Sequence, residues 1–202
     1  MSNVTLLTGP PGIGKSTALR KIAESFKLDA ITAIVSSEIR EDGKRQGFQM
    51  EVLGTGQRGL LASPNVESDV RFGTLLPDGR RRLGVTFDFL DGTACPELRR
   101  GISRKSLLLV DEIGPMQASS ALFRSIIEEV FEKRYPLVAS IAQSDDPWIS
   151  NVRDQSGAAL LVLDRWNRDL ITEALVTYLP LRYSGVTRND DAVPQKGESL
   201  GA

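Results

Sequence analysis

A run of nine residues near the N-terminus carries the clearest chemistry in the chain. Its first eight residues match G-x-x-x-x-G-K-[ST] and are Gly9, Pro10, Pro11, Gly12, Ile13, Gly14, Lys15 and Ser16; Thr17 follows them. Glycines let the backbone curl so that successive amide N–H groups point at one centre and hold an anion. A lysine there can neutralise the β- and γ-phosphates of a nucleotide, and a hydroxyl can ligate Mg²⁺. The pattern therefore predicts a phosphate-binding loop, with Lys15 as its cation and Ser16 as a metal ligand.

Two adjacent carboxylates, Asp111 and Glu112, follow the apolar run at residues 107–110. Four consecutive apolar residues are typical of a strand buried on both faces, and ligands of open α/β sheets bind where such strands end. Asp111 is then placed to hold Mg²⁺ through water, and Glu112 to polarise a water molecule against the γ-phosphate. Lys15 and Glu112 are the predicted catalytic residues, and the second carboxylate favours hydrolysis over transfer to an acceptor.

The composition excludes several other chemistries. The 202 residues include no histidine and one cysteine, Cys95, so there is no Ser-His-Asp triad, no histidine zinc site and no internal disulfide. With 25 Lys+Arg against 26 Asp+Glu, the net charge of −1 provides no general field for nucleic acid or anionic membranes. The longest apolar run, residues 158–163, is shorter than the roughly 20 residues of a membrane span, and no signal peptide opens the chain. We therefore expect a cytoplasmic protein with no membrane partner.

The elements that must position these residues alternate as in an α/β protein. Residues 4–8 form an apolar strand, residues 15–26 carry apolar side chains at helical spacing, and residues 30–36 are apolar and β-branched. This order is a βαβ unit with a right-handed parallel crossover. Strands are predicted again at 106–110, 137–142 and 158–163, and helices after Ser119-Ser120, at Asp146-Pro147 and over 167–178.

The middle of the chain, residues 40–90, has a different pattern. Segments 48–53, 70–75 and 83–89 alternate in polarity between glycines and the turn Pro77-Asp78-Gly79, which predicts antiparallel hairpins inserted into the main sheet or edging it. A G-x-G-x-x-G pattern over residues 54–59 precedes no helix, so we interpret it as a glycine turn. We expect one domain over residues 1–180 and a disordered polar tail over residues 181–202.

Three strings resemble a known family, the P-loop nucleoside-triphosphatases described in thermophiles and as cancer-related NTPases. They are GPPGIGKST, LLLVDEIGPM and the pair Asn167-Arg168, and between them Glu38-Ile39-Arg40, Gly47-Phe48 and Gly59-Leu60 keep that family's order. The resemblance covers residues 4–179 and implies a RecA-like, mostly parallel sheet between helices. It also implies slow, Mg²⁺-dependent hydrolysis of ATP, GTP and other nucleoside triphosphates to diphosphate and phosphate.

The resemblance extends to individual residues. It carries over Gly12, Gly14, Lys15 and Ser16 as phosphate and metal binders, Asp111 and Glu112 as metal and water residues, and Arg40 and Arg168 as positions that can touch phosphate or base. One departure follows the carboxylates, where the family usually has Lys-Met-Glu and this chain has Pro115-Met116-Gln117. A cation and a carboxylate are missing there, which puts any step that used them in question.

Two other functions remain compatible with the same loop. A small-molecule kinase would clamp its acceptor with Arg80-Arg81-Arg82 or with Arg99-Arg100. A nucleotide-gated binding module would hold RNA or protein on the basic patch Arg99-Arg100 with Arg104-Lys105, although no aromatic platform accompanies that patch. Phosphate release without an acceptor separates hydrolysis from the kinase, and salt-sensitive nucleic-acid binding that differs between ATP and ADP would indicate the module.

Overall fold

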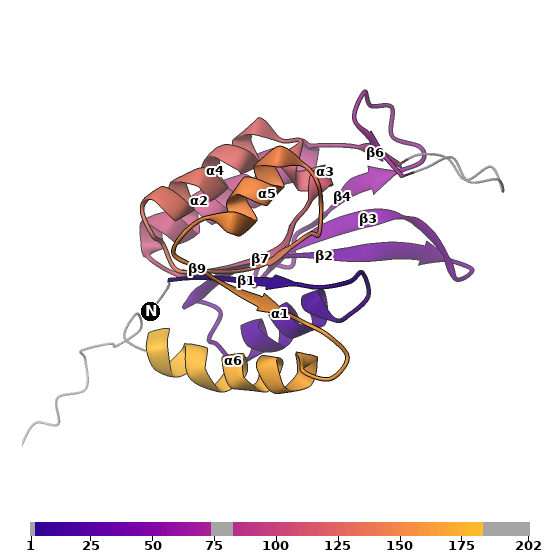
Figure 1. Cartoon of the computed structure of the whole chain (residues 1–202). Coiled ribbons are helices and arrows are strands. Elements are labelled where there is room, and N and C mark those ends of the chain that lie inside the picture. The colour runs from indigo at the N-terminus through magenta and orange to yellow at the C-terminus, as the bar shows by residue number, and fades with distance from the viewer. Residues whose placement is uncertain (1–2, 74–82, 184–202) are drawn as a thin grey trace, which may run out of the picture.

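One mixed sheet with helices on both faces organises the molecule (Figure 1). The computed structural model describes residues 3–73 and 83–183. Within these two ranges nine strands pair in the order β5-β6-β4-β3-β2-β7-β8-β1-β9. One end of this sheet is parallel and the other is antiparallel.

The parallel end carries the predicted site. Its strands are β1 (Val4–Thr8), β2 (Ile31–Glu41), β7 (Leu107–Ile113), β8 (Leu137–Ile141) and β9 (Ala158–Val162). Every pairing among them is parallel. In β7 and β8 every residue except Glu112 is buried, as their apolar runs predict. At the outer position, β9 leaves Leu160 and Val162 exposed.

The antiparallel end extends the sheet beyond β2. It consists of β3 (Lys44–Leu53), β4 (Arg58–Ser63), β5 (Arg71–Phe72) and β6 (Leu83–Val85). The predicted hairpins are confirmed, but the expectation of a mostly parallel sheet is corrected, because four of the eight pairings in the described residues are antiparallel. The predicted glycine turn joins β3 to β4, and a Cβ on Gly59 would lie 2.3 Å from the Phe89 ring.

Helices cover the two faces of the sheet with separate cores. On one face lie α1 (Lys15–Glu24) and α6 (Arg168–Tyr183), and on the other lie α2 (Cys95–Arg104), α4 (Ala121–Glu132) and α5 (Pro147–Asp154) (Figure 1). A short helix, α3 (Pro115–Ala118), follows β7. Leu19 and Ile22 of α1 pack in one core, and Phe123 and Ile126 of α4 pack in the other. Among the described helices, none has the length and hydropathy needed to cross a membrane.

Two predicted helix starts are confirmed. Ser120 accepts a hydrogen bond from Phe123 N at 3.0 Å at the start of α4. Asp146 accepts from the backbone N–H groups of Trp148 and Ile149 at 2.9 and 3.1 Å, which fixes the start of α5.

Two predicted segments are corrected. The strand expected over 83–89 ends at Val85, and helical structure begins at residue 88, with a π-helical turn, Leu90–Ala94, leading into α2. The reason is the burial of Leu90, Ala94, Leu98 and Ile102 at a spacing of four, which favours a helix over a strand.

The tail expected from residue 181 also begins too early, because α6 continues to Tyr183, which packs against the core beside α1. Residues 184–202 lie outside the described part of the chain, as do residues 74–75 of the segment predicted over 70–75 and the run Arg80-Arg81-Arg82.

Candidate active site

The phosphate loop has the geometry that its sequence predicts. β1 ends at Thr8 and α1 begins at Lys15, so the loop lies between a strand and a helix N-terminus, whose free amide N–H groups attract anions. Gly12 and Gly14 have φ values of 76° and 109°, which glycine adopts without strain. A Cβ on Gly9 would lie 2.5 Å from Leu163 O, so that position also requires glycine.

The cation of the loop lies against its backbone. Lys15 Nζ donates to Gly9 O at 3.0 Å and to Pro10 O at 3.4 Å. Ile13 N donates to Pro10 O at 3.2 Å, which tightens the turn. The ammonium group is therefore held at the mouth of the loop, where Ser16 and Thr17 also line the adjacent cleft.

The first carboxylate, Asp111, is held from both neighbouring strands. It is 2% exposed, and its Oδ1 accepts a hydrogen bond from Ser140 Oγ of β8 at 2.5 Å. Its Oδ2 lies 3.4 Å from Ser36 N of β2, and Ser36 Oγ donates to the Asp111 carbonyl at 2.5 Å. These contacts fix the orientation of the carboxylate at the end of β7.

The second carboxylate, Glu112, faces the cation of the loop. Its Oε1 lies 3.8 Å from Lys15 Nζ. Burial raises the pKa of Glu112, the positive charge of Lys15 lowers it, and the negative charge of Asp111 raises it, with a net rise above the ordinary value. A carboxylate whose pKa lies above its usual range is a better proton acceptor than an exposed one.

A cleft of about 510 Å³ brings these groups together. Besides the loop and the two carboxylates, its lining includes Ser36, Glu38, Arg45 and Phe48 from β2 and β3. The guanidinium of Arg45 pairs with Glu38 at 3.1 Å and lies 5.3 Å from the centre of the Phe48 ring. Sequence reasoning identified neither Arg45 nor the two serines on Asp111.

The departure from the family pattern lies beside Glu112. Gln117 is 2% exposed and lines the cleft, and among buried side-chain atoms of the described residues its Oε1 alone has no hydrogen-bond partner. A Cβ on Gly114 would lie 3.0 Å from Glu112 Oε2 and 3.4 Å from Gln117 Oε1, so both oxygens lie close to that glycine. Because Gln117 is a neutral amide, it adds no negative charge beside Glu112 to that of Asp111.

The arginines singled out in the sequence lie in different places. Arg168 Nη1 donates to Ile13 O at 3.3 Å, so this side chain touches the phosphate loop. Arg40 instead pairs with Glu38 at 2.5 Å and is absent from the cleft lining. The pair considered as an acceptor clamp, Arg99-Arg100, lies within α2, and Arg100 pairs with Glu97 at 2.8 Å.

The polar side chains of the cleft fit a small, hard cation that takes most of its ligands from water and from the substrate. In the described residues no group of three or more Asp, Glu, Cys or His side chains is placed to hold a metal ion. Ser16 and Asp111 contribute one hydroxyl and one carboxylate to the cleft. Mg²⁺ suits such a site, because it usually keeps several waters and is completed by substrate phosphates.

A glycine loop between β1 and α1, with a carboxylate at the end of another parallel strand of the same sheet, defines the class of P-loop NTPases. A family model described as NTPase matches residues 4–176. The chain is 31% identical over 174 residues to the nucleoside-triphosphatase THEP1 of Thermotoga sp. (strain RQ2), covering 86% of this chain and 94% of the relative. It is 33% identical over 175 residues to THEP1 of Methanosarcina acetivorans, covering 84% and 92%. The chain belongs to the THEP1 family of nucleoside-triphosphatases.

Solved structures share the fold. The crystal structure of THEP1 from Aquifex aeolicus matches with a TM-score of 0.70 and 27% identity, over 85% of this chain and 95% of that one. The solution structure of a human cancer-related nucleoside triphosphatase matches in fold, with a TM-score of 0.66 and 24% identity over 87% and 96%. The family resemblance noted in the sequence is thereby confirmed.

Proposed function

We propose that the protein hydrolyses nucleoside 5′-triphosphates, ATP and GTP among them, to diphosphate and phosphate with the help of Mg²⁺. One observation carries the proposal: Lys15 and Glu112 meet at 3.8 Å in a cleft that Asp111 and Ser16 also line. A cation, a proton acceptor and two metal ligands thus converge on one point. This is the equipment that transfer of a phosphoryl group to water requires.

The loop binds and orients the triphosphate. Backbone N–H groups of the non-proline residues of the loop surround the phosphates, and the positive end of α1 points at the same place. Lys15 exchanges its contacts with the Gly9 and Pro10 carbonyls for phosphate oxygens and offsets charge that develops on the γ-phosphoryl group. Arg168, which touches the loop at Ile13, adds a further contact to the nucleotide.

Ser16 and Asp111 are the residues that would hold Mg²⁺ in this cleft. When bound, the ion would supply positive charge that offsets the negative charge developing on the phosphate oxygens. Ser140 and Ser36 keep the Asp111 carboxylate aimed at that position.

Glu112 orients the attacking water and accepts its proton. The water oxygen bonds to the γ-phosphorus as the bond from that phosphorus to the β–γ bridging oxygen breaks, and nucleoside diphosphate leaves. Because burial raises the pKa of Glu112, the carboxylate is a stronger base than an exposed one, while the Lys15 charge beside it keeps the ionised form accessible.

The strand order supports the finer features of the proposal. One strand, β8, separates the phosphate-loop strand β1 from the carboxylate strand β7, as expected for a RecA-like core. One sheet runs through the described residues, which supports the prediction of a single domain. The described residues give the kinase alternative less support, because Arg99 and Arg100 lie on α2 and do not line the cleft; the other clamp considered, Arg80-Arg81-Arg82, lies outside the described residues.

The test is phosphate release from a panel of nucleoside triphosphates with and without Mg²⁺. Lys15→Ala should lower kcat by about 10²–10³-fold, the cost of removing one group that stabilises transition-state charge. Glu112→Gln should lose hydrolysis and retain nucleotide binding. Lys21→Ala is the matched control, because Lys21 is an exposed lysine of the same helix. Unchanged phosphate release in Lys15→Ala, or in Glu112→Gln with nucleotide bound, would refute these roles.

A further inference from the structure

Trp166, in the segment between β9 and α6, is the most exposed large apolar side chain of the described residues, at 76%. The guanidinium carbon of Arg165 lies 4.6 Å from the centre of its ring. One face of the indole therefore carries a cation, and the remaining surface faces solvent. The exposed part of the ring is therefore available to stack on a planar ligand.

The backbone that carries Trp166 is firmly held. Asp164 Oδ1 accepts from Trp166 N at 2.7 Å and from Asn167 N at 2.8 Å. In return Asp164 N donates to Asn167 Oδ1 at 2.9 Å, and Asn167 Nδ2 donates to Val162 O at 3.0 Å. These reciprocal bonds fix the turn, so the point from which the indole projects is set in advance.

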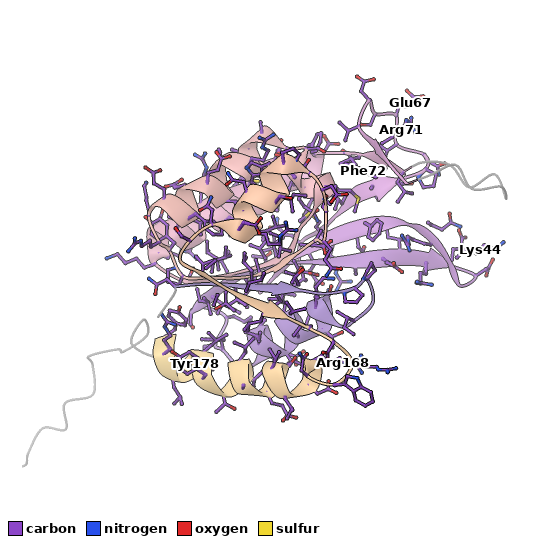
Figure 2. All side chains as sticks on the ribbon, viewed as in Figure 1. Lys44, Glu67, Arg71, Phe72, Arg168 and Tyr178 are labelled. Atoms are coloured by element: carbon purple, nitrogen blue, oxygen red, sulfur yellow. The ribbon has the colours of Figure 1, made fainter. Side chains whose placement is uncertain are left out.

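The same segment abuts the phosphate loop. Leu163 N donates to Thr8 O at 2.7 Å, immediately before the loop begins, and Leu163 O would lie 2.5 Å from a Cβ on Gly9. Two residues after the indole, Arg168 Nη1 donates to Ile13 O at 3.3 Å. Figure 2 shows Arg168 at the start of α6. Trp166 thus lies in a segment that is joined to the loop on both sides of it.

The sheet order gives the direction in which the nucleoside leaves the loop. β9 neighbours β1 on one side, whereas β7, with Asp111 and Glu112, lies on the other side beyond β8. A triphosphate whose γ-phosphate faces Glu112 therefore points its α-phosphate and nucleoside towards β9. That is the side on which Trp166 follows the strand end.

We propose that Trp166 is the stacking platform for the nucleobase, with Arg165 on the opposite face of the indole. The inference rests on the proposed hydrolysis of nucleoside triphosphates and assigns the base-binding part of that site. Stacking uses the π-face that every base has, so it selects weakly among bases. The platform predicts that adenine, guanine and pyrimidine nucleotides bind with similar affinity.

The test uses the fact that the chain has two tryptophans. The other, Trp148, donates its indole N–H to Glu128 on the opposite side of the sheet, so Trp148→Phe leaves Trp166 as the sole indole emitter. Mg²⁺-ADP should quench this emission, GDP and UDP should do the same, and Mg²⁺-pyrophosphate, which has no base, should not. ADP that binds by calorimetry without changing the Trp166 emission would overturn the proposal.

A second measurement compares ligands with and without a base. Trp166→Ala should raise the Kd of ADP relative to that of pyrophosphate by roughly ten- to a hundredfold, as expected for one stacked base. Trp166→Phe should keep most of the affinity, and Leu170→Ala is the control because Leu170 is 69% exposed on α6, the helix that follows Trp166. A loss in Phe48→Ala with none in Trp166→Ala would place the base in the cleft instead. Failure of phosphate release with every nucleotide, while ADP still quenches Trp166, would refute the hydrolysis and leave the platform standing.

Discussion

The hydrogen bond from Ser140 to Asp111 predicts a loss of both stability and metal affinity when it is removed. Ser140 is 0% exposed and Asp111 is 2% exposed, and Ser140 Oγ lies 2.5 Å from Asp111 Oδ1. Hydrogen bonds to charged groups contribute about 1.5–3 kcal/mol. Because water cannot easily reach this pair, Ser140→Ala leaves the carboxylate oxygen with one donor fewer. We expect the free energy of unfolding in urea to fall by about 2 kcal/mol.

The effect on the site should be separable from the effect on the fold. Asp111 keeps its charge in Ser140→Ala but loses the contact that orients it from β8. Loss of an outer-shell partner typically costs about 10–100-fold in metal affinity. The concentration of Mg²⁺ that gives half-maximal phosphate release should therefore rise by about tenfold or more, with kcat largely recovered at saturating Mg²⁺.

The control is Ser125→Ala, which removes an exposed hydroxyl that donates to Leu122 O within α4. It should change the free energy of unfolding by less than about 0.5 kcal/mol and leave the Mg²⁺ dependence as it was. A destabilised Ser140→Ala protein with an unchanged Mg²⁺ titration would show that Asp111 does not hold the metal. A protein unaffected in both measurements would refute the reasoning from burial.

Three further predictions concern other groups. Burial raises the pKa of Glu112, so its proton is bound more tightly in the folded chain than in the unfolded chain. The free energy of unfolding of the wild type, measured relative to Glu112→Gln, should therefore rise as the pH falls through this raised pKa. The rise should level off below the unfolded-state pKa of about 4.3. A difference that shrinks on acidification, measured by urea titration, would contradict the burial of Glu112. Asp146→Ala removes the cap of α5 and should cost about 1 kcal/mol in the same assay, whereas Asp146→Asn should cost less. Burial, and after it the charge of Asp91, raise the pKa of the Cys95 thiol to about 12, although the charge of Arg99 lowers it. A maleimide should therefore label Cys95 at pH 8 only after the protein unfolds. Rapid labelling of the folded protein would contradict this prediction.

The parts of the site that the sequence predicted correctly depend on local chemistry. The loop begins after Thr8 and ends at Lys15 because glycine, lysine and a helix start must adjoin to hold a phosphate. Asp111 and Glu112 were identified because an apolar run ended in two carboxylates. Both patterns occupy a few consecutive residues, so they can be read without knowing the fold.

The missed parts depend on which strands become neighbours. Ser36 and Ser140 hold Asp111 only because β2 and β8 flank β7, and that order arises from packing across the whole sheet. Arg45 reaches the cleft because the β2–β3 hairpin extends the sheet on that side. In the sequence, Trp166 is only an aromatic residue beside the family pair Asn167-Arg168. Its relation to the phosphate loop follows only from the position of β9 next to β1 in the sheet.

The fold class and most elements could be predicted, and the errors have a common cause. The segment at 83–89 alternates in polarity like a strand, but the residues that follow have a helical pattern. Leu90 and Leu98 belong to that pattern and are buried in the core. Likewise the polar composition from residue 181 onward predicts a disordered tail, whereas the burial of Leu179 keeps α6 helical to Tyr183. In both places tertiary contacts decided between local alternatives.

The position of β1 in the sheet also has a consequence for biosynthesis. β1 is translated before every other described element, yet its two partners are β8 and β9, which end at Ile141 and Val162. Neither edge of β1 can pair within the sheet until those distant segments have left the ribosome, so formation of the phosphate loop must wait for them. Nucleotide binding by a nascent chain would therefore report that the parallel half of the sheet is complete. A chain that stops before β9 would expose one edge of β1, and its residues 4–8 would be open to pairing with other chains.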